Sequence, residues 1–345
     1  MQDVSGVVTF VGLDAHFERT TIKAVDRKGR AVLETEVKTT VRSLRAALRK
    51  LRGPVWCMME SSTMSFFVKE CVEPVVDRAI VCETRENRWI AKSEKKTDPH
   101  DADRLARLLR MGEFQEVHVP ARPRQEIREL VQAYQKAVND VVRAKNRLNA
   151  KYRRHGIAVD GSLYVEERER GLAQIKRPNL QVILNAQYGI LDAALEAREA
   201  LAAKLHAILS HTKEYRLLCT IPGVGQIVAA IFVAVIDAPE RFETKRKLWA
   251  YAGFGLRERW SGDPGKARKG GSKKGNRLLK YAALLAAKSA ICGKNRFARR
   301  FCEMTANGIH PEMAKKTIAR NILATARAMW MSGTAYRDDM MADAA

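Results

Sequence analysis

The sequence predicts an α/β domain followed by a mainly helical remainder, so the expected fold class is α/β plus all-α. Two observations support this division. Runs of β-branched and alternating apolar residues are confined to residues 1–115. Long segments with apolar residues at three- and four-residue spacing, typical of amphipathic helices, occupy the rest. The length of 345 residues fits roughly two or three domains, and we expect three parts, residues 1–115, 116–215 and 216–345.

The first part has a recognisable order of elements. Five strands are expected at residues 7–13, 20–24, 31–37, 54–59 and 78–82. The turn Asp26–Arg27–Lys28–Gly29 joins the second strand to the third as a hairpin. Helices are expected at residues 40–51 and 63–71, on either side of the fourth strand. Three meandering strands, a helix, a strand, a helix and a strand form the order of an RNase H-like sheet, in which the first and fourth strands are neighbours.

The second and third parts are predicted to be mainly helical. Residues 124–154 and 191–211 read as two long helices, separated by the polar, irregular residues 156–179, and together they predict a helical or coiled-coil arm. The third part opens with the sequence IPGVG between two helical runs. Gly223 and Gly225 give this turn the look of a helix-hairpin-helix, whose backbone amides can bind a DNA phosphate. A plain turn between helices is the alternative.

Composition excludes several classes of protein. An apolar fraction of 46% and a charged fraction of 29% are typical of a folded chain. The longest apolar run, residues 227–236, is well short of the ~20 residues that span a bilayer, and no signal peptide is visible at the N-terminus. The cysteines have no zinc-binding spacing, and Cys57 and Cys82 read as core residues. We therefore expect a cytoplasmic protein in a reducing compartment.

The charge balance indicates the kind of partner. Lysine and arginine total 62 against 39 acidic residues, which leaves a net charge of +23. Positive charge on this scale usually binds phosphates. A membrane surface is the other candidate, but no lipidation motif or amphipathic terminal helix accompanies the charge. Nucleic acid is the expected partner.

Four carboxylates stand where the predicted sheet could gather them. Asp14 follows the first strand, and Glu60 ends the fourth. Asp98 and Asp101 open a helix at Pro99, and residues three apart on a helix lie ~5–6 Å apart at their Cβ atoms. Each acid alone is more simply a turn or capping residue. Together they form the hard-oxygen set that holds two Mg²⁺ ions in nucleases with this fold, and we favour the metal site.

Residues 251–280 form a glycine-rich, basic segment. Seven lysines and arginines and no acid lie between residues 266 and 280. A flexible loop that makes nonspecific phosphate contacts is the simplest interpretation. The segment and its neighbouring turn supply the predicted nucleic-acid contacts: Arg257, Arg259, Lys266, Arg268, Lys269, Ser272, Lys273, Lys274, Arg277, Gly223 and Gly225.

Six short sequences then occur in a fixed order along nearly the whole chain: VGLDAH, the Glu of MMESS, KTDPHDAD, IPGVG, YAGFGLRERWSG and GSKKGN. In this order and spacing they resemble the DEDD-type insertion-sequence transposases of the IS110 group. Relatives of that group include bridge-RNA-guided recombinases and Piv-like DNA invertases. The resemblance implies a RuvC-like N-terminal domain, a coiled-coil arm and a C-terminal transposase domain.

The same resemblance implies roles for individual residues. Asp14, Glu60, Asp98 and Asp101 correspond to the DEDD metal ligands, which implies two Mg²⁺ ions per site. Ser261 corresponds to a nucleophile that forms a covalent phosphoserine link to DNA, with Ser272 as the alternative nucleophile. The resemblance also implies donor and target double-stranded DNA, a structured guide RNA, a homodimer or homotetramer on DNA, and a bacterial, nucleoid-associated location.

Two other functions are consistent with the residues. A hydrolytic RuvC-like nuclease or junction resolvase would use the four carboxylates, with Ser261 only contacting DNA. A nucleic-acid-binding scaffold would use the acids only for capping and pairing. We expect a transposase that cuts and rejoins DNA, because a serine hydroxyl activated beside a metal-carboxylate site can store the energy of the cut bond.

Overall fold

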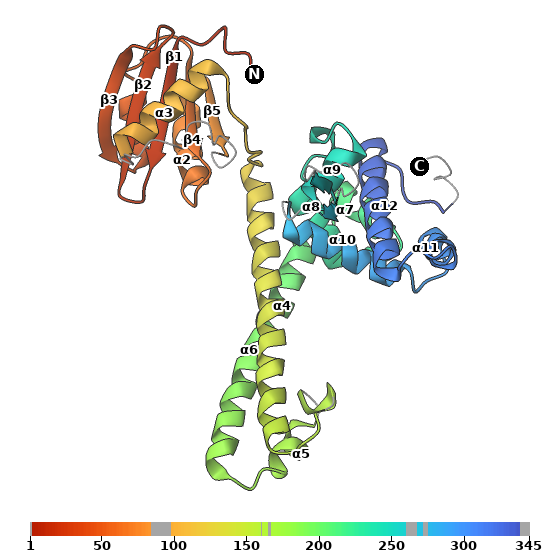
Figure 1. Cartoon of the computed structure of the whole chain (residues 1–345). Helices are drawn as coiled ribbons and strands as arrows, with labels where there is room; N and C mark the ends of the chain where they lie inside the picture. The colour runs from red at the N-terminus through yellow and green to blue at the C-terminus, as the bar shows by residue number, and fades with distance from the viewer. Residues whose placement is uncertain are drawn as a thin grey trace. The chain divides into compact units, whose positions relative to one another are not determined.

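The computed structural model describes residues 2–83, 98–159, 161–164, 167–259, 268–271 and 275–338. The chain divides into two compact units, Met1–Pro120 and Ala121–Ala345, and each is described by itself. The helical arm belongs to the second unit, together with the C-terminal helices (Figure 1). None of the helices in the described ranges is both long and apolar enough to cross a membrane.

The first unit is built on a five-stranded mixed sheet. Its strands are β1 (Thr9–Ala15), β2 (Arg19–Asp26), β3 (Ala31–Lys38), β4 (Val55–Glu60) and β5 (Arg78–Cys82). They lie in the order β3-β2-β1-β4-β5, with β1 antiparallel to β2 and parallel to β4. The predicted neighbours β1 and β4 are therefore confirmed, and the order is consistent with an RNase H-like domain.

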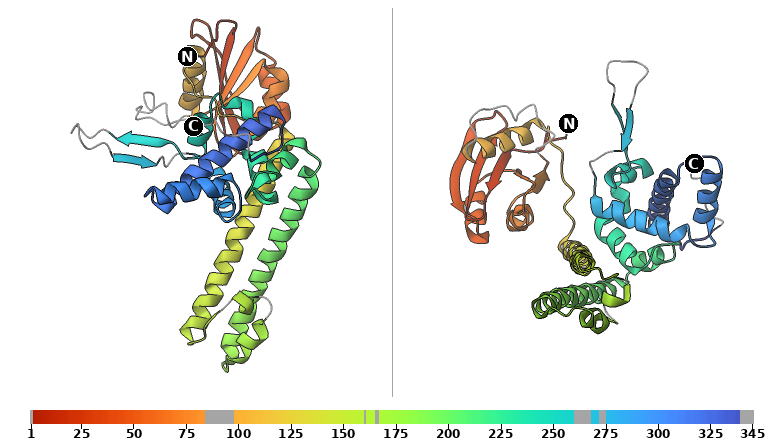
Figure 2. Two further views of the ribbon diagram at one scale, coloured as in Figure 1. Left: turned by 90° about the vertical axis from the view of Figure 1, so that its right-hand side faces the viewer. Right: turned by 60° about the horizontal axis from the view of Figure 1, so that its bottom comes forward.

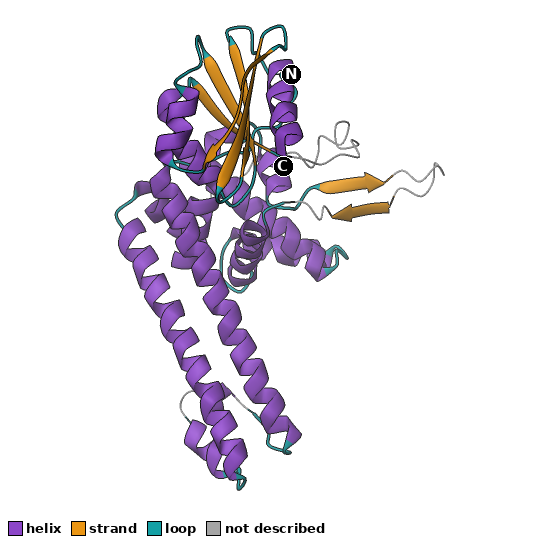
Figure 3. Ribbon diagram, turned by 90° about the vertical axis from the view of Figure 1, so that its left-hand side faces the viewer, coloured by secondary structure: helices purple, strands orange, loops and turns teal. Residues whose placement is uncertain are grey.

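Helices cover both faces of this sheet (Figure 3). Helices α1 (Val41–Leu48) and α2 (Ser65–Val72) bury one face, and a short 3₁₀ helix, η1 (Glu73–Val75), follows α2. Helix α3 (Asp98–Met111) buries the other face. Successive residues of a strand point to opposite faces, and β1 follows this rule: Val11 and Leu13 pack beneath α1 and α2, whereas Phe10 packs beneath α3.

Two long helices form the arm of the second unit. They are α4 (Arg122–Arg154) and α6 (Pro178–Leu209), joined through η3 (Gly161–Tyr164) and α5 (Arg168–Ala173). Leu148 and Tyr152 of α4 pack against Leu184 and Tyr188 of α6, and the two tyrosine hydroxyls lie 2.9 Å apart. The prediction that the second arm helix begins at residue 191 is wrong, because α6 begins at Pro178, a residue suited to the first turn of a helix.

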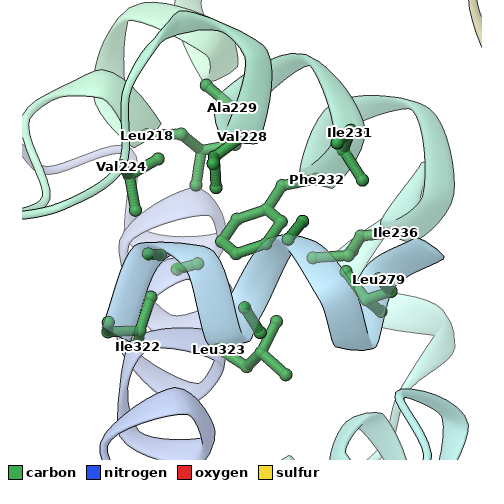
Figure 4. Packing of buried hydrophobic residues seen from close by; sticks show 14 of the residues in the cluster. Leu218, Val224, Val228, Ala229, Ile231, Phe232, Ile236, Leu279, Ile322 and Leu323 are labelled. Carbon is green, nitrogen blue, oxygen red and sulfur yellow. The ribbon is translucent and has the colours of Figure 1, made fainter. Parts of the chain in front are cut away.

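The rest of the second unit packs around one buried helix. Helix α8 (Gln226–Ile236) is the apolar run that the sequence showed, and every residue from Val228 to Ile236 is buried. Its side chains pack against those of the helices that surround it (Figure 4). The surrounding elements are α7 (Lys213–Cys219), η4 (Pro239–Arg241), α9 (Lys245–Tyr251), α10 (Arg277–Ala290), α11 (Arg296–Ala306) and α12 (Pro311–Ser332).

A two-stranded hairpin interrupts these helices. Strands β6 (Leu256–Arg259) and β7 (Arg268–Gly271) pair antiparallel, and they project from the helical part of the unit (Figure 2). The interpretation of residues 251–280 as a simple flexible loop is therefore wrong for these two strands. Short, charged, glycine-containing strands carry little apolar alternation, so no pattern of residues predicted strands there.

Candidate active site

The two predicted strand carboxylates lie at neighbouring strand ends. The pairing of β1 with β4 runs in register from Thr9 opposite Val55 to Leu13 opposite Met59. Asp14 and Glu60 are the next residues on the two strands. Because adjacent strands are about 4.8 Å apart, these two residues lie side by side at one edge of the sheet.

Both carboxylates belong to the face that α3 covers. Phe10 and Met58 pack against α3, and residues at even spacing along a strand share a face. Asp14 is four residues beyond Phe10, and Glu60 is two beyond Met58, so both fall on the α3 side. Leu13 and its neighbours pack on the opposite side, beneath α1 and α2.

Helix α3 crosses β1 at a glycine and in a defined direction. A Cβ atom on Gly12 would lie 1.9 Å from the Ala102 carbonyl oxygen, so no other residue allows the helix this close. The backbone N–H of Gln2, which precedes β1, donates to the carbonyl of Gly112, just beyond the end of α3 (2.9 Å). The helix therefore runs antiparallel to β1, and its first turn lies at the edge where Asp14 and Glu60 stand.

That first turn contains the other two predicted carboxylates. Asp101 directly precedes Ala102, and its side chain is 33% exposed, with Oδ1 3.8 Å from Nη1 of Arg104. Helix α3 begins at Asp98, although the side chain of Asp98 lies outside the described part of the structure. One edge of the sheet therefore carries Asp14 at the end of β1, Glu60 at the end of β4 and Asp101 in the first turn of α3.

The remaining acid of this helix is held in ion pairs. Oδ2 of Asp103 accepts from Nε of Arg107 at 2.6 Å, and its Oδ1 lies 3.6 Å from Nζ of Lys23. The hydrogen bond that Arg107 donates to Asp103 raises the pKa of the Arg107 guanidinium. Asp103 therefore has a structural role between α3 and β2, which makes it a suitable control for the other carboxylates.

A histidine accompanies Asp14. Nε2 of His16 lies 3.4 Å from Oδ2 of Asp14, whose side chain is 19% exposed. Gly12 and His16 were not among the site residues predicted from the sequence. The glycine had a signal, since it stands two residues before an acid in an otherwise apolar strand, but its contact with α3 depends on tertiary packing.

The donor atoms at this edge suit a hard divalent cation. Carboxylate oxygens are the ligands that Mg²⁺ and Ca²⁺ prefer, and three of the four predicted ligands lie at the same edge. Among the described side chains, no three His, Cys, Asp or Glu residues converge closely enough to hold a metal ion. The set therefore suits a cation in its chemistry, but Asp14, Glu60 and Asp101 do not converge closely enough to hold one by themselves. The side chain of Asp98, the fourth predicted ligand, lies outside the described part of the structure.

The cysteines of the sheet do not add a nucleophile to this edge. Cys57 and Cys82 are fully buried, as the sequence predicted. Burial raises the pKa of the Cys82 thiol to about 12 and also raises the pKa of Cys57. Both thiols stay protonated at neutral pH, and a thiolate is the reactive form.

The two strands of the hairpin stand before and after the predicted nucleophile in the sequence. The register ends with Arg259 opposite Arg268, and residues 260–267, which include Ser261 and Lys266, lie outside the described residues. Ser272, Lys273 and Lys274 also lie outside them. The backbones of Arg257, Arg259, Arg268 and Lys269 are described as strand, but their side chains are not.

The two ends of the hairpin are fixed to each other. The N–H of Asn276 donates to the carbonyl of Tyr251 (2.7 Å), and Nζ of Lys280 donates to the carbonyl of Gly253 (2.9 Å). Gly275 has a φ of 130°, and a Cβ atom there would lie 2.5 Å from the Gly253 nitrogen. Arg277 follows as the first, exposed residue of α10. The serine-bearing segment is thus anchored to the helical unit by a tight backbone junction.

The two glycines of the IPGVG turn differ in their surroundings. Gly223 has a φ of 82°, and a Cβ atom there would lie 2.3 Å from the Ala286 carbonyl oxygen of α10. Gly225 is the N-cap of α8, and no atom lies within 4 Å of its would-be Cβ. Gly223 is therefore required by packing, whereas Gly225 leaves the start of α8 open to a ligand.

Comparison with known families agrees with this arrangement. A family model described as "Transposase", of the DEDD IS110 type, matches residues 11–154, which include the sheet carboxylates and α3. A second model, described as "Transposase IS116/IS110/IS902 family", matches residues 215–303, which include the IPGVG turn and the hairpin. The chain belongs to the IS110 family of transposases.

Two relatives from this comparison carry related names. The chain is 26% identical over 275 residues to a Sinorhizobium fredii protein named "Putative transposase y4qE", an alignment that covers 77% of this chain and 68% of that protein. It is 28% identical over 163 residues to a Streptomyces coelicolor protein named "Insertion element IS110 uncharacterized 43.6 kDa protein", which covers 47% of this chain and 40% of that one. As a member of the IS110 family, the chain is a transposase.

Proposed function

We propose that this IS110-family transposase cuts and rejoins DNA at a composite site made of the four carboxylates and Ser261. The observation that supports the proposal best is the shared edge of the first unit. There Asp14 and Glu60 end neighbouring parallel strands, and the close approach of α3 to Gly12 brings Asp101 to the same edge. An RNase H/RuvC-like domain would use this edge for phosphodiester chemistry.

Asp14, Glu60, Asp98 and Asp101 are the residues that would hold Mg²⁺, two ions per site. When bound, a pair of such ions stabilises charge on the attacking and leaving oxygens of a phosphodiester. A cluster of acids in a chain of net charge +23 is otherwise hard to reconcile with a nucleic-acid substrate. The ion pairs of Asp103 show how an acid of this helix is held when its role is structural.

Ser261 supplies the covalent step. Its Oγ attacks the scissile phosphorus, a bond forms between Oγ and phosphorus, and the bond from phosphorus to one sugar oxygen breaks. The serine proton is transferred to that oxygen, which leaves as a hydroxyl. Attack by a hydroxyl of another strand reverses these changes, so strands rejoin without ATP. Arg257, Arg259 and Lys273 would neutralise the charge that develops on the phosphate.

Basic residues would hold the nucleic acids. The predicted contacts Arg268, Lys269 and Arg277 follow the serine in the sequence, in the hairpin and its flank. At the start of α8, the open amides at Gly225 suit a backbone phosphate. Donor and target double-stranded DNA are the proposed partners, with a structured bridge RNA as guide. The protein would act as a dimer or tetramer on DNA, in the bacterial cytoplasm at the nucleoid.

A covalent trapping assay tests it. The chain is incubated with Mg²⁺, end-labelled donor and target DNA and RNA from the flank of the element, and the products are separated on a denaturing protein gel. We expect a protein-linked DNA band for the wild type and no such band for Ser261→Ala or Asp101→Ala, whereas Ser272→Ala retains it. Free cut DNA that persists in Ser261→Ala and is lost in Asp101→Ala would instead establish a hydrolytic nuclease.

A further inference from the structure

One aromatic side chain at the candidate edge is almost fully exposed. Phe17 lies in the turn between β1 and β2, three residues after Asp14, and it is 82% exposed. This turn follows the C-terminal end of β1, so it stands at the same edge of the sheet as Asp14 and Glu60. By comparison, Phe66 of α2 is 42% exposed, on the side of the sheet opposite α3.

The turn that carries Phe17 is rigidly supported. His16 N–H donates to the carbonyl of Arg19 (3.0 Å), which closes a two-residue turn around Phe17 and Glu18. Thr39, at the end of β3, then contacts the turn twice: its N–H donates to the Glu18 carbonyl (3.0 Å), and its hydroxyl donates to the His16 carbonyl (2.7 Å).

A buried hydroxyl pair supports Thr39 in turn. The Oγ1 atoms of Thr20 and Thr39 lie 2.9 Å apart, Thr20 is fully buried, and Thr39 is 8% exposed. Because the Thr39 hydroxyl donates its proton to the His16 carbonyl, the Thr20 hydroxyl must donate to Oγ1 of Thr39. A buried network of three linked hydrogen bonds therefore fixes the backbone on both sides of an exposed phenyl ring, and so pre-organises the ring for contact with something outside the unit.

We infer that Phe17 is a stacking platform for a nucleobase of the DNA strand that enters the carboxylate edge. This inference rests on the proposed function, since that function places DNA at this edge. Base stacking on an aromatic ring is worth about 1–3 kcal/mol per base and tolerates any sequence. The charge of +23 already supplies attraction for the backbone, whereas an uncharged phenyl ring would add contact with a base.

The position of the ring gives this contact a specific use. Phe17 is three residues from Asp14 and stands in the turn at the same edge, so a base on its face would belong to a nucleotide near the phosphate that reaches the carboxylates. Stacking there would fix the register of the strand without reading its sequence. Phe17 is therefore a positioning residue for the substrate.

Photocrosslinking with the full chain tests the inference. A single-stranded oligonucleotide carrying 5-iodouracil at one position is bound in the presence of Mg²⁺ and irradiated, and the crosslinked peptide is identified by mass spectrometry. We expect a crosslink to Phe17. Phe17→Leu should abolish that crosslink and weaken binding roughly 5- to 100-fold, and Phe17→Trp should restore both. Phe66→Leu is the matched control and should behave as the wild type.

Two results would overturn the inference. One is a Phe17→Leu variant that binds the oligonucleotide as tightly as the wild type, with no crosslink at position 17 in either protein. The other is a change in the sedimentation of DNA-free Phe17→Leu without a crosslink, which would mean that the ring packs against a second copy of the chain. Because Phe17 is exposed, thermal unfolding of Phe17→Leu should match that of the wild type.

The proposed function is tested separately by Asp14→Asn. If this variant keeps the crosslink at Phe17 but no longer cuts DNA, both the function and the platform are supported. If it cuts DNA as the wild type does, the proposed function fails, and the presence or absence of the crosslink still decides the role of Phe17. If Asp14→Asn loses cutting and Phe17→Leu is unaltered, the function stands and the platform is wrong.

Discussion

At the scale of single residues, the two glycines of the IPGVG turn have different structural roles. Gly223 adopts a positive φ and contacts the backbone of α10, with its would-be Cβ 2.3 Å from the Ala286 oxygen. Gly225 has open space around it at the start of α8. A residue with a side chain at position 223 must adopt a left-handed conformation and displace backbone atoms, whereas position 225 has neither constraint.

This difference predicts opposite behaviour for two alanine variants. Gly223→Ala should lower the free energy of unfolding by roughly 2–5 kcal/mol, the sum of left-handed strain and overpacking. Gly225→Ala should lower it by about 1 kcal/mol or less, the loss of a tolerated N-cap, yet weaken DNA binding because a methyl group covers the amides of α8. Urea unfolding and filter binding measure the two effects. Equal stability of the two variants would contradict the packing described for Gly223.

The residues of the candidate site could be predicted to different depths. Asp14 and Glu60 could be placed side by side from the order of strands alone, because parallel strands that are neighbours end at the same edge. The approach of α3 over Gly12 could not, since it depends on a contact between residues about 90 positions apart. Nor could the pairing of Asp103 with Lys23, which likewise joins distant segments of the chain.

At the scale of elements, the end of α8 depends on arginines from two other segments. Arg128 of α4 donates to the carbonyls of Ala234 (2.6 Å) and Val235 (3.2 Å), and burial lowers the pKa of its guanidinium. Arg241 donates to the carbonyl of Ile236 (3.0 Å). The last carbonyls of a helix have no partner within the helix. Arg128 therefore connects the arm to the end of α8, and Arg241 of η4 binds the same end.

Loss of one of these arginines should destabilise the second unit as a whole. Arg128→Leu removes two hydrogen bonds from a charged donor, and only the Val235 carbonyl keeps a second arginine donor, Nη2 of Arg241 (3.3 Å). The cost is roughly 2–4 kcal/mol, which corresponds to about 5–15 °C in Tm. Arg122→Leu, on the same helix but 75% exposed, should change Tm by less than about 2 °C. Differential scanning calorimetry measures both. A Tm of Arg128→Leu equal to that of Arg122→Leu would disprove the capping role.

Elements with strong periodicity could be predicted from sequence, and those without it could not. The strands of the sheet carry β-branched runs, and all five lie within about two residues of the predicted bounds. Helix α6 begins 13 residues before the prediction, because exposed apolar residues such as Val182 and Ile183 hide the helical spacing of its buried residues Leu180, Leu184 and Tyr188. The β6–β7 hairpin was missed because its four-residue strands are mostly charged or glycine.

At the scale of the whole molecule, the predicted metal ligands and the predicted nucleophile belong to different units of the chain. The first unit carries the carboxylates of the sheet edge, and the second unit carries the basic hairpin and the predicted serine. Composition predicted a nucleic-acid partner through the charge of +23. The proposed transposition chemistry depends on both units, so the carboxylate edge must be tested in the full chain.

The most direct measurement is the rate of Mg²⁺-dependent DNA cutting by carboxylate variants of the full chain. Asp14→Asn and Glu60→Gln should each lose several kcal/mol of transition-state stabilisation, which lowers the rate roughly 10²- to 10⁴-fold. Asp103→Asn changes an acid of the same region that is held in ion pairs, and should cut at a rate within about threefold of the wild type. Folded Asp14→Asn and Glu60→Gln proteins that cut DNA as fast as Asp103→Asn would contradict the assignment of this edge as the active site.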